Sequence, residues 1–174
     1  PLTSLEVLRG SRFRTFSPMT NRFAALIGAS PVLVQQAEVA QAFATGIATA
    51  MVTSAQTGVD TAAWDYARVF TPATFSMTKN AVIVSRRALE GLPQDHRQAL
   101  LAAAEKANER GWRWSEEAEE ASVKRRAERG MQIGTVTDEL RAQLAEINRV
   151  MTEEWIQRAG EDGRKLIEQF RAGA

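Results

Sequence analysis

Residues 12–34 read RFRTFSPMTNRFAALIGASPVLV and contain two strand signals with one helix signal between them. Residues 12–16 alternate polar and aromatic side chains, which is the period-two pattern of a half-buried strand. Ser17-Pro18 marks the end of this strand. The following segment carries Phe23, Leu26 and Ile27 on one helical face, with Gly28 as its stop. Residues 30–34 predict the second strand.

The same alternation continues toward the carboxyl terminus. Residues 38–45 predict a helix closed by Gly46, and residues 50–53 predict a third strand. Strands alternating with helices at this spacing predict an α/β unit with a largely parallel sheet. Ligands in such sheets bind beyond the carboxyl ends of the strands. The candidate binding residues are therefore the polar ones just after each strand: Ser17, Gln35 and Gln36, and Thr53 with Ser54.

The second half of the chain reads as helical, after one last strand signal. Residues 80–85, NAVIVS, have the clearest strand pattern in the chain. A helix is expected from Pro93 to about residue 129, a length of about 54 Å at 1.5 Å per residue. Such a helix must bridge two bodies, protrude, or break near Gly111. Two further helices are expected at about 138–158 and 161–171, separated by Gly160.

Composition excludes several classes of protein. The 174 residues are 44% hydrophobic and 25% charged, with a net charge of +1, as in an ordinary soluble domain. This balance provides no concentrated basic surface, so no nucleic-acid partner is expected. There is no cysteine, which excludes disulfides but does not choose between periplasm and cytoplasm. No apolar run approaches the roughly 20 residues that span a bilayer. Because the chain begins at Pro1, we expect a trimmed or truncated product.

No pattern in the sequence indicates an enzyme. There is no nucleophile elbow, Gly-rich phosphate loop or metal-binding constellation, so neither a cofactor nor a metal is expected. His96 is the only histidine and is expected to be solvated. The charged stretch at residues 116–126, which ends in Lys124, Arg125 and Arg126, is interpreted as a solvated helix face.

The string LEVLRGSRFR at residues 5–14 is the first of five landmarks that, in order, resemble the solute-binding proteins of TRAP transporters, the DctP-type extracytoplasmic receptors. It resembles the family's S-L-E-D-L-K-G-x-K-I-R start of the second domain. The other landmarks are GASP at residues 28–31, EV with AFATG at residues 38–46, LEGLP at residues 89–93, and Trp155 in the terminal helices. The resemblance covers essentially the whole chain.

The resemblance implies a fold, a location and partners. The fold would be an α/β lobe of the periplasmic binding protein type, with residues 1–92 as the second lobe of two. Residues 93–174 would form the long interlobe helix and the terminal helices, and the amino-terminal lobe would be absent from this chain. The implied function is a periplasmic receptor that captures a small organic acid for the membrane subunits of a TRAP transporter. Apolar surface left by the missing lobe would favour a homodimer.

Arg14 is the first candidate for ligand binding. It matches the arginine of the family's K-I-R, which forms a salt bridge with the ligand carboxylate. A planar guanidinium offers two parallel donors to a carboxylate and stays charged at any working pH. The alternative from the residues alone is a solvated strand residue, because Arg12 and Arg14 share one face of the strand.

The other candidates depart from the family's pattern. Thr53 falls where the family commonly has the asparagine of D-G-x-E-N-P, and residues 49–55 here lack Asp, Glu and Asn. Thr53 and Ser54 could donate to an anion or act only as a helix cap. Asn80 occupies a position where some members have a polar amide facing the cleft, and Gln36 one where some have an aromatic residue. Ser17 and Gln36 also fit simple turn residues.

One alternative class stays open from the sequence. The long charged helix could be a dimerisation or adaptor element on an α/β scaffold. Such a module predicts sustained heptads over residues 94–129, and these are not visible because Trp112 and Trp114 cannot share a face.

Overall fold

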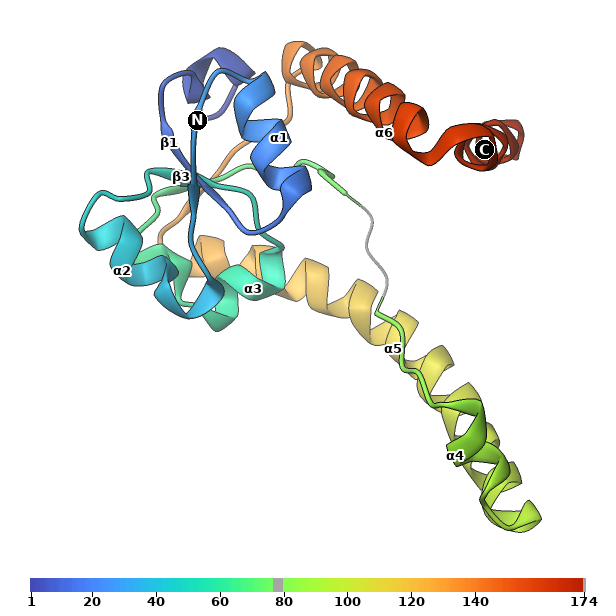
Figure 1. Ribbon diagram of the computed structural model, residues 1–174. Helices are drawn as coiled ribbons and strands as arrows, with labels where there is room; N and C mark the ends of the chain where they lie inside the picture. Colours follow the sequence, from blue (N-terminus) through green and yellow to red (C-terminus); the bar gives the residue numbers. More distant parts are fainter. Residues whose placement is uncertain (77–79, 174) are drawn as a thin grey trace.

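This computed structural model describes residues 1–76 and 80–173. The body of the protein contains a three-stranded parallel sheet (Figure 1). β1 (Arg12–Thr15) lies in the centre, between β2 (Ser30–Leu33) and β3 (Ala50–Met51). In the parallel register Arg14 pairs with Val32 on one side and with Met51 on the other. The prediction of an α/β fold with a largely parallel sheet is confirmed.

The central strand is buried on both faces. Phe13, Arg14 and Thr15 are all buried, so the prediction of a half-buried strand was wrong. The physical reason is the position of β1, because a central strand of a parallel sheet is covered on both faces. Alternate side chains of β1 therefore point into two different buried environments, one on each face of the sheet.

The Phe13 face of the sheet is covered by α1 (Pro18–Leu26). Phe23 of α1 packs against Phe13, with ring centroids 5.7 Å apart. The helix begins in a capping box, in which Ser17 Oγ accepts the Thr20 N–H at 3.2 Å. Gly28 has a φ of +70° just beyond the helix, a conformation that glycine adopts without steric cost.

The opposite face carries a second apolar cluster. It is formed by α2 (Val39–Ala44), which follows the 3-10 helix η2 (Gln36–Glu38), and by residues before and after these two helices. Its members are Val34, Val39, Ala42 and Ala48, with Val32, Phe43, Met51 and Tyr66 packed against them. Since Arg14 pairs with Val32 and Met51, its side chain belongs to this face.

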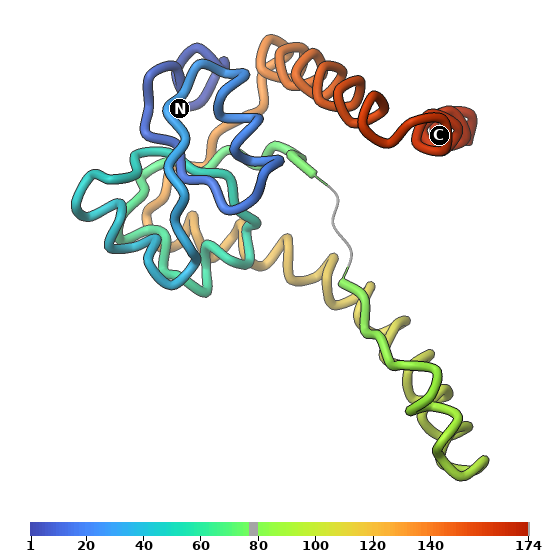
Figure 2. The backbone as a smooth tube through the Cα atoms, in the orientation of Figure 1, coloured from blue at the N-terminus to red at the C-terminus, as the bar shows by residue number. Residues whose placement is uncertain are grey.

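The remaining elements lie around the sheet, apart from α6, which starts beside α1 and extends away from the sheet (Figures 1 and 2). They are η1 (Leu5–Leu8), α3 (Ala55–Asp60), η3 (Ala63–Asp65), the parallel pair β4 (Val69–Phe70) and β5 (Gln132–Ile133), and α6 (Asp138–Ala172). Gly160, with φ 71° and ψ −153°, interrupts the helical geometry inside α6. The predicted division of the terminal helices at Gly160 is confirmed.

An arm formed by α4 (Arg86–Glu90) and the first part of α5 (Gln94–Glu128) stands away from the body (Figures 1 and 2). α5 has 35 residues, passes Gly111 without a break, and returns to the body only in its last turns. No residue between 80 and 121 is buried. The predicted long helix is confirmed. Of the three arrangements expected for it, the structure shows the second, because the helix protrudes from the body.

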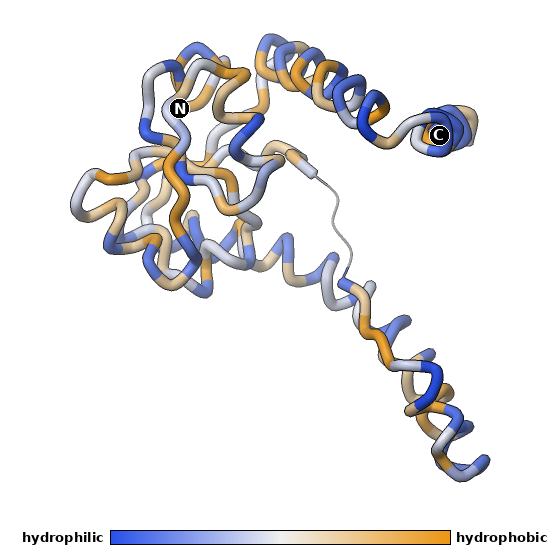
Figure 3. Tube along the Cα trace, viewed as in Figure 1, coloured by the Kyte–Doolittle hydropathy of each residue, from blue (hydrophilic) through white to orange (hydrophobic). Residues whose placement is uncertain are grey.

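The strand predicted at residues 80–85 is wrong. This segment forms no strand, and Val82 and Ile83 are 103% and 89% exposed. A strand requires a neighbour for its backbone hydrogen bonds, and no described strand pairs with this segment. Figure 3 shows it as an apolar stretch at the start of the arm.

Gly160→Ala tests the break in α6. The substitution should lower the free energy of unfolding by about 1–3 kcal/mol, because its φ and ψ belong to a region that only glycine adopts readily. No atom lies within 4 Å of an added Cβ, so the loss reports the backbone alone. Gly111→Ala is the matched control and should not destabilise, since that glycine is helical and also faces open space. Urea unfolding followed by circular dichroism measures both, and equal effects would contradict the prediction.

Candidate ligand-binding site

The carboxyl ends of β1, β2 and β3 meet at one edge of the sheet, because the strands are parallel. Ser17 follows β1, Gln36 follows β2, and Thr53 and Ser54 follow β3, so four of the six predicted binding residues share this edge. Asn80 does not follow a strand of this sheet. It is exposed and lies at the start of the arm.

Arg14 is directed toward this edge from within β1. Its side chain is 6% exposed, and its Nε–H donates to the carbonyl oxygen of Val34, the residue after β2, at 2.9 Å. The guanidinium carbon lies 4.4 Å from the ring centroid of Phe16, the residue after β1. The solvated alternative for Arg14 is therefore wrong, whereas Arg12 is exposed.

The Arg14 guanidinium has no carboxylate partner among residues 1–76 and 80–173. Burial lowers the pKa of Arg14, and the nearby Tyr66 acts on that pKa in the opposite direction. A cation that is removed from water and has no internal counter-ion is the arrangement that an anionic ligand completes.

Two of the predicted serines cap helices. Ser17 caps α1, as described above, and Ser54 Oγ accepts the Thr57 N–H at 3.0 Å at the start of α3. The capping alternative is thus confirmed for Ser54, whereas Ser17, expected as a simple turn residue, is also a helix cap. The contact of either serine with a ligand stays a prediction. Thr53 is partly exposed between β3 and α3. Gln36 is exposed and lines a shallow pocket of 480 Å³ together with Ala37, Ala40 and Thr61.

Sequence reasoning missed Arg126. It was interpreted as part of a solvated face, but its side chain is 1% exposed. Its Nη2 donates to the carbonyl oxygens of Ser54 at 2.8 Å and Ala55 at 2.9 Å, in the turn that holds two candidate binding residues. The available signal was the spacing of Ser122 and Arg126, which puts both side chains on one helix face. Ser122 Oγ donates to Gln56 Oε1 at 2.8 Å on that face.

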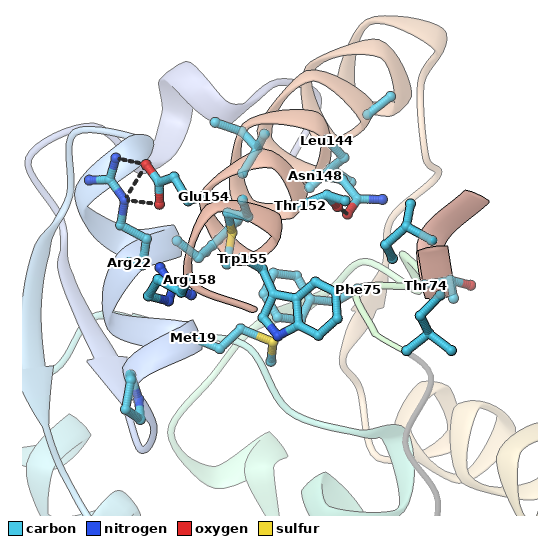
Figure 4. A pocket seen from close by; sticks show the side chains of 17 residues that line it. Met19, Arg22, Thr74, Phe75, Leu144, Asn148, Thr152, Glu154, Trp155 and Arg158 are labelled. Atoms are coloured by element: carbon cyan, nitrogen blue, oxygen red, sulfur yellow. Dashed lines mark hydrogen bonds and ion pairs between the residues drawn. The ribbon is translucent and has the colours of Figure 1, made fainter. Parts of the chain in front are cut away.

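A larger pocket lies elsewhere, between α1 and α6 on the Phe13 face (Figure 4). It has a volume of 920 Å³, and none of the six predicted binding residues lines it. Met19, Phe75 and Trp155 provide apolar walls, and Arg22 is already bonded to Glu154 (Figure 4). Because Arg22 is already paired with the carboxylate of Glu154, the pocket suits an apolar surface better than an acid.

Two further properties concern the described part of the chain. No group of three His, Cys, Asp or Glu side chains within it could hold a metal ion. None of its helices combines the length and apolar character that crossing a bilayer requires.

Comparison with known proteins identifies the family. The family model of the bacterial extracellular solute-binding proteins, family 7 (DctP), matches residues 1–158. A comparison with curated proteins finds no match. The similar solved structures include receptors of TRAP type.

Two similar structures come from Bordetella pertussis. The extracytoplasmic solute receptor DctP7, which binds pyroglutamic acid, is 38% identical with a TM-score of 0.85, over 98% of this chain and 57% of its own. The receptor DctP6, which also binds pyroglutamic acid, is 37% identical with a TM-score of 0.90, over 99% of this chain and 57% of its own.

A third similar structure is a TRAP solute-binding protein from a marine metagenome, specific for pyroglutamate and solved with copurified pyroglutamate. It is 28% identical with a TM-score of 0.88, over 99% of this chain and 57% of its own. This chain therefore spans a little more than half the length of these relatives. The comparisons give no support to the alternative of a helical interaction module. The family match over residues 1–158, together with these structures, leads to one conclusion: the chain belongs to the bacterial extracellular solute-binding proteins of family 7, the DctP family of TRAP transporter receptors.

Proposed function

We propose that this chain provides the second lobe and terminal helices of a periplasmic receptor that captures a small organic acid for a TRAP transporter. The observation that carries the proposal is Arg14, a 6% exposed guanidinium at the carboxyl edge of the sheet with no carboxylate partner among the described residues. The receptor delivers its acid to the membrane subunits of the transporter and performs no chemistry on it.

The proposed ligand is pyroglutamate or another cyclic carboxylate of similar size. Three similar receptors bind pyroglutamate, two of them at 38% and 37% identity. Pyroglutamate carries one carboxylate on a lactam ring. Its carboxylate suits the two parallel donors of Arg14. The lactam amide needs one donor and one acceptor, which the Thr53 and Ser54 hydroxyls can supply.

In the proposed domain arrangement, the first lobe of the receptor covers the arm. Residues 1–92 belong to the second lobe and residues 93–174 to the interlobe and terminal helices, and the first lobe packs on the arm. Support comes from exposed apolar side chains along the arm: Val82, Ile83, Val84, Leu100, Leu101, Trp112 and Trp114. A concentration of exposed apolar side chains of this kind is characteristic of a protein interface. Without the first lobe, the same surface favours association of two copies of this chain.

The ligand proposal is tested with the two-lobe receptor and a panel of organic acids. Pyroglutamate at about 100 times its Kd should raise the free energy of unfolding by about 2.7 kcal/mol, which thermal shift measures readily. Arg14→Ala should abolish the shift relative to its own ligand-free baseline, and Arg14→Lys should leave a reduced shift because lysine lacks the paired donors. Arg12→Ala, two residues away on the same strand but exposed, is the control and should keep the full shift. A full shift in Arg14→Ala would rule out Arg14 as the anchor.

The domain proposal is tested by hydrogen exchange in residues 81–84. These amides should exchange rapidly in this chain alone, since the segment has no strand partner. In the two-lobe receptor they should be strongly protected, because the first lobe supplies the missing hydrogen bonds. Residues 13–15, inside the sheet of this chain, are the internal control and should be protected in both proteins. Equally fast exchange of residues 81–84 in both would exclude the proposed docking.

A further inference from the structure

Arg126 is one of two buried arginines in the described residues, and no carboxylate pairs with it there. Burying a cation without an ion pair is unfavourable unless its donors are bonded. The Arg126 Nη2 is bonded to two backbone carbonyls, whereas its Nε is buried without a partner. A simple helix contact could be made by an apolar side chain at lower cost, so the arginine needs a more specific explanation.

The contacts of Arg126 converge on the turn between β3 and α3. Its two hydrogen bonds go to the carbonyl oxygens of Ser54 and Ala55. Its guanidinium carbon lies 4.0 Å from the ring centroid of Phe70, which covers the other side. A Cβ on Gly58 would lie 1.6 Å from Nη2, so the absence of a side chain at this position of α3 makes room for the guanidinium.

This turn needs support because β3 is short. β3 has only two residues, and its Met51 is the register partner of Arg14. Two residues later the chain reaches Thr53, and then Ser54, both proposed to face the ligand. The short ladder fixes one end of this turn, and the hydrogen bonds of Arg126 fix the other. The distance between these hydroxyls and the Arg14 guanidinium therefore depends on a residue of α5.

Arg14 and Arg126 place two buried positive charges at this site. Burial lowers the pKa of Arg126, as it does for Arg14. The carboxylate of Glu119 acts on the pKa of Arg126 in the opposite direction, and Tyr66 does so for both arginines. The Tyr66 hydroxyl therefore lies within electrostatic reach of both guanidinium groups. Neither arginine forms a salt bridge within the described residues, so the two buried cations together favour an anion at this edge.

We propose that Arg126 is a positioning residue for ligand binding, which holds the Thr53–Ser54 turn against the carboxyl edge of the sheet beside Arg14 without touching the ligand itself. The inference rests on the proposed function, since it assumes that this edge binds an acid. It adds that the affinity for the acid depends on how α5 is seated on the body.

The first measurement needs no ligand. Hydrogen exchange of residues 52–60 reports the turn, because the Thr57 and Gly58 amides donate to Ser54 Oγ and to the Ser54 carbonyl oxygen. Arg126→Met keeps the length of the side chain but loses its donors, and should accelerate this exchange about tenfold or more. Arg126→Lys, which keeps the charge and fewer donors, should give a smaller increase. Arg125→Met, at the neighbouring but exposed arginine of the same helix, is the matched control and should leave the segment unchanged.

The second measurement uses pyroglutamate with the two-lobe receptor. Arg126→Met should weaken binding about tenfold, and its effect should not add to that of Thr53→Ala, because both disturb one turn. A purely structural role would lower the melting temperature and give additive effects on Kd. Unchanged exchange in both Arg126 variants, or additive effects on Kd, would overturn the inference. If no acid binds the wild-type receptor, the proposed function fails, while the exchange data still decide whether Arg126 holds the turn.

Discussion

The parallel pairing of β1 with both of its neighbours is the constraint on which the site depends. Because Arg14 pairs with Val32 and Met51, the three strands must end at the same edge. The register also determines where the chain can leave the sheet after β3, two residues before Thr53. Since β3 contributes only two residues to the ladder, its exit requires a second support, which α5 provides through Arg126. The sheet and the long helix thus together position the polar side chains at the carboxyl edge of the sheet.

The elements that sequence reasoning predicted correctly carry their own local signals. The strands at residues 30–34 and 50–53 are short apolar runs between turn residues, and their pairing follows from the alternation with helices. The long helix has a proline at its start and no later breaker strong enough to stop it. Gly160 divides α6 because its backbone conformation excludes other residues. In each case the interactions that determine the element are local, so the sequence of about one turn or one strand is enough to predict it.

The elements that were missed depend on partners distant in the sequence. Residues 80–85 have the composition of a strand, but hydrogen bonding between strands requires a neighbour that the described chain does not supply. Arg126 follows Lys124 and Arg125, and beyond its spacing from Ser122 it is the contact with α3, with Gly58 opposite, that distinguishes it from these neighbours. Arg14 was selected because of a family motif, and its burial could not be deduced from Arg12 on the same face. Ser17 and Ser54 show the remaining ambiguity, because a helix cap and an anion donor use the same hydroxyl.

The length of α5 has a mechanical consequence. From Arg126 back to the first residue of the helix, the axis extends about 48 Å at 1.5 Å per residue, most of it beyond the body. A rigid rod of that length amplifies rotation, so a tilt of about 10° at the seat of Arg126 displaces its far tip by about 8 Å. Sub-ångström rearrangements at the edge of the sheet can in this way become movements as large as a side chain. Any rotation of α5 would thus be coupled to the turn that carries Thr53 and Ser54, through the hydrogen bonds of Arg126 to the carbonyl oxygens of Ser54 and Ala55.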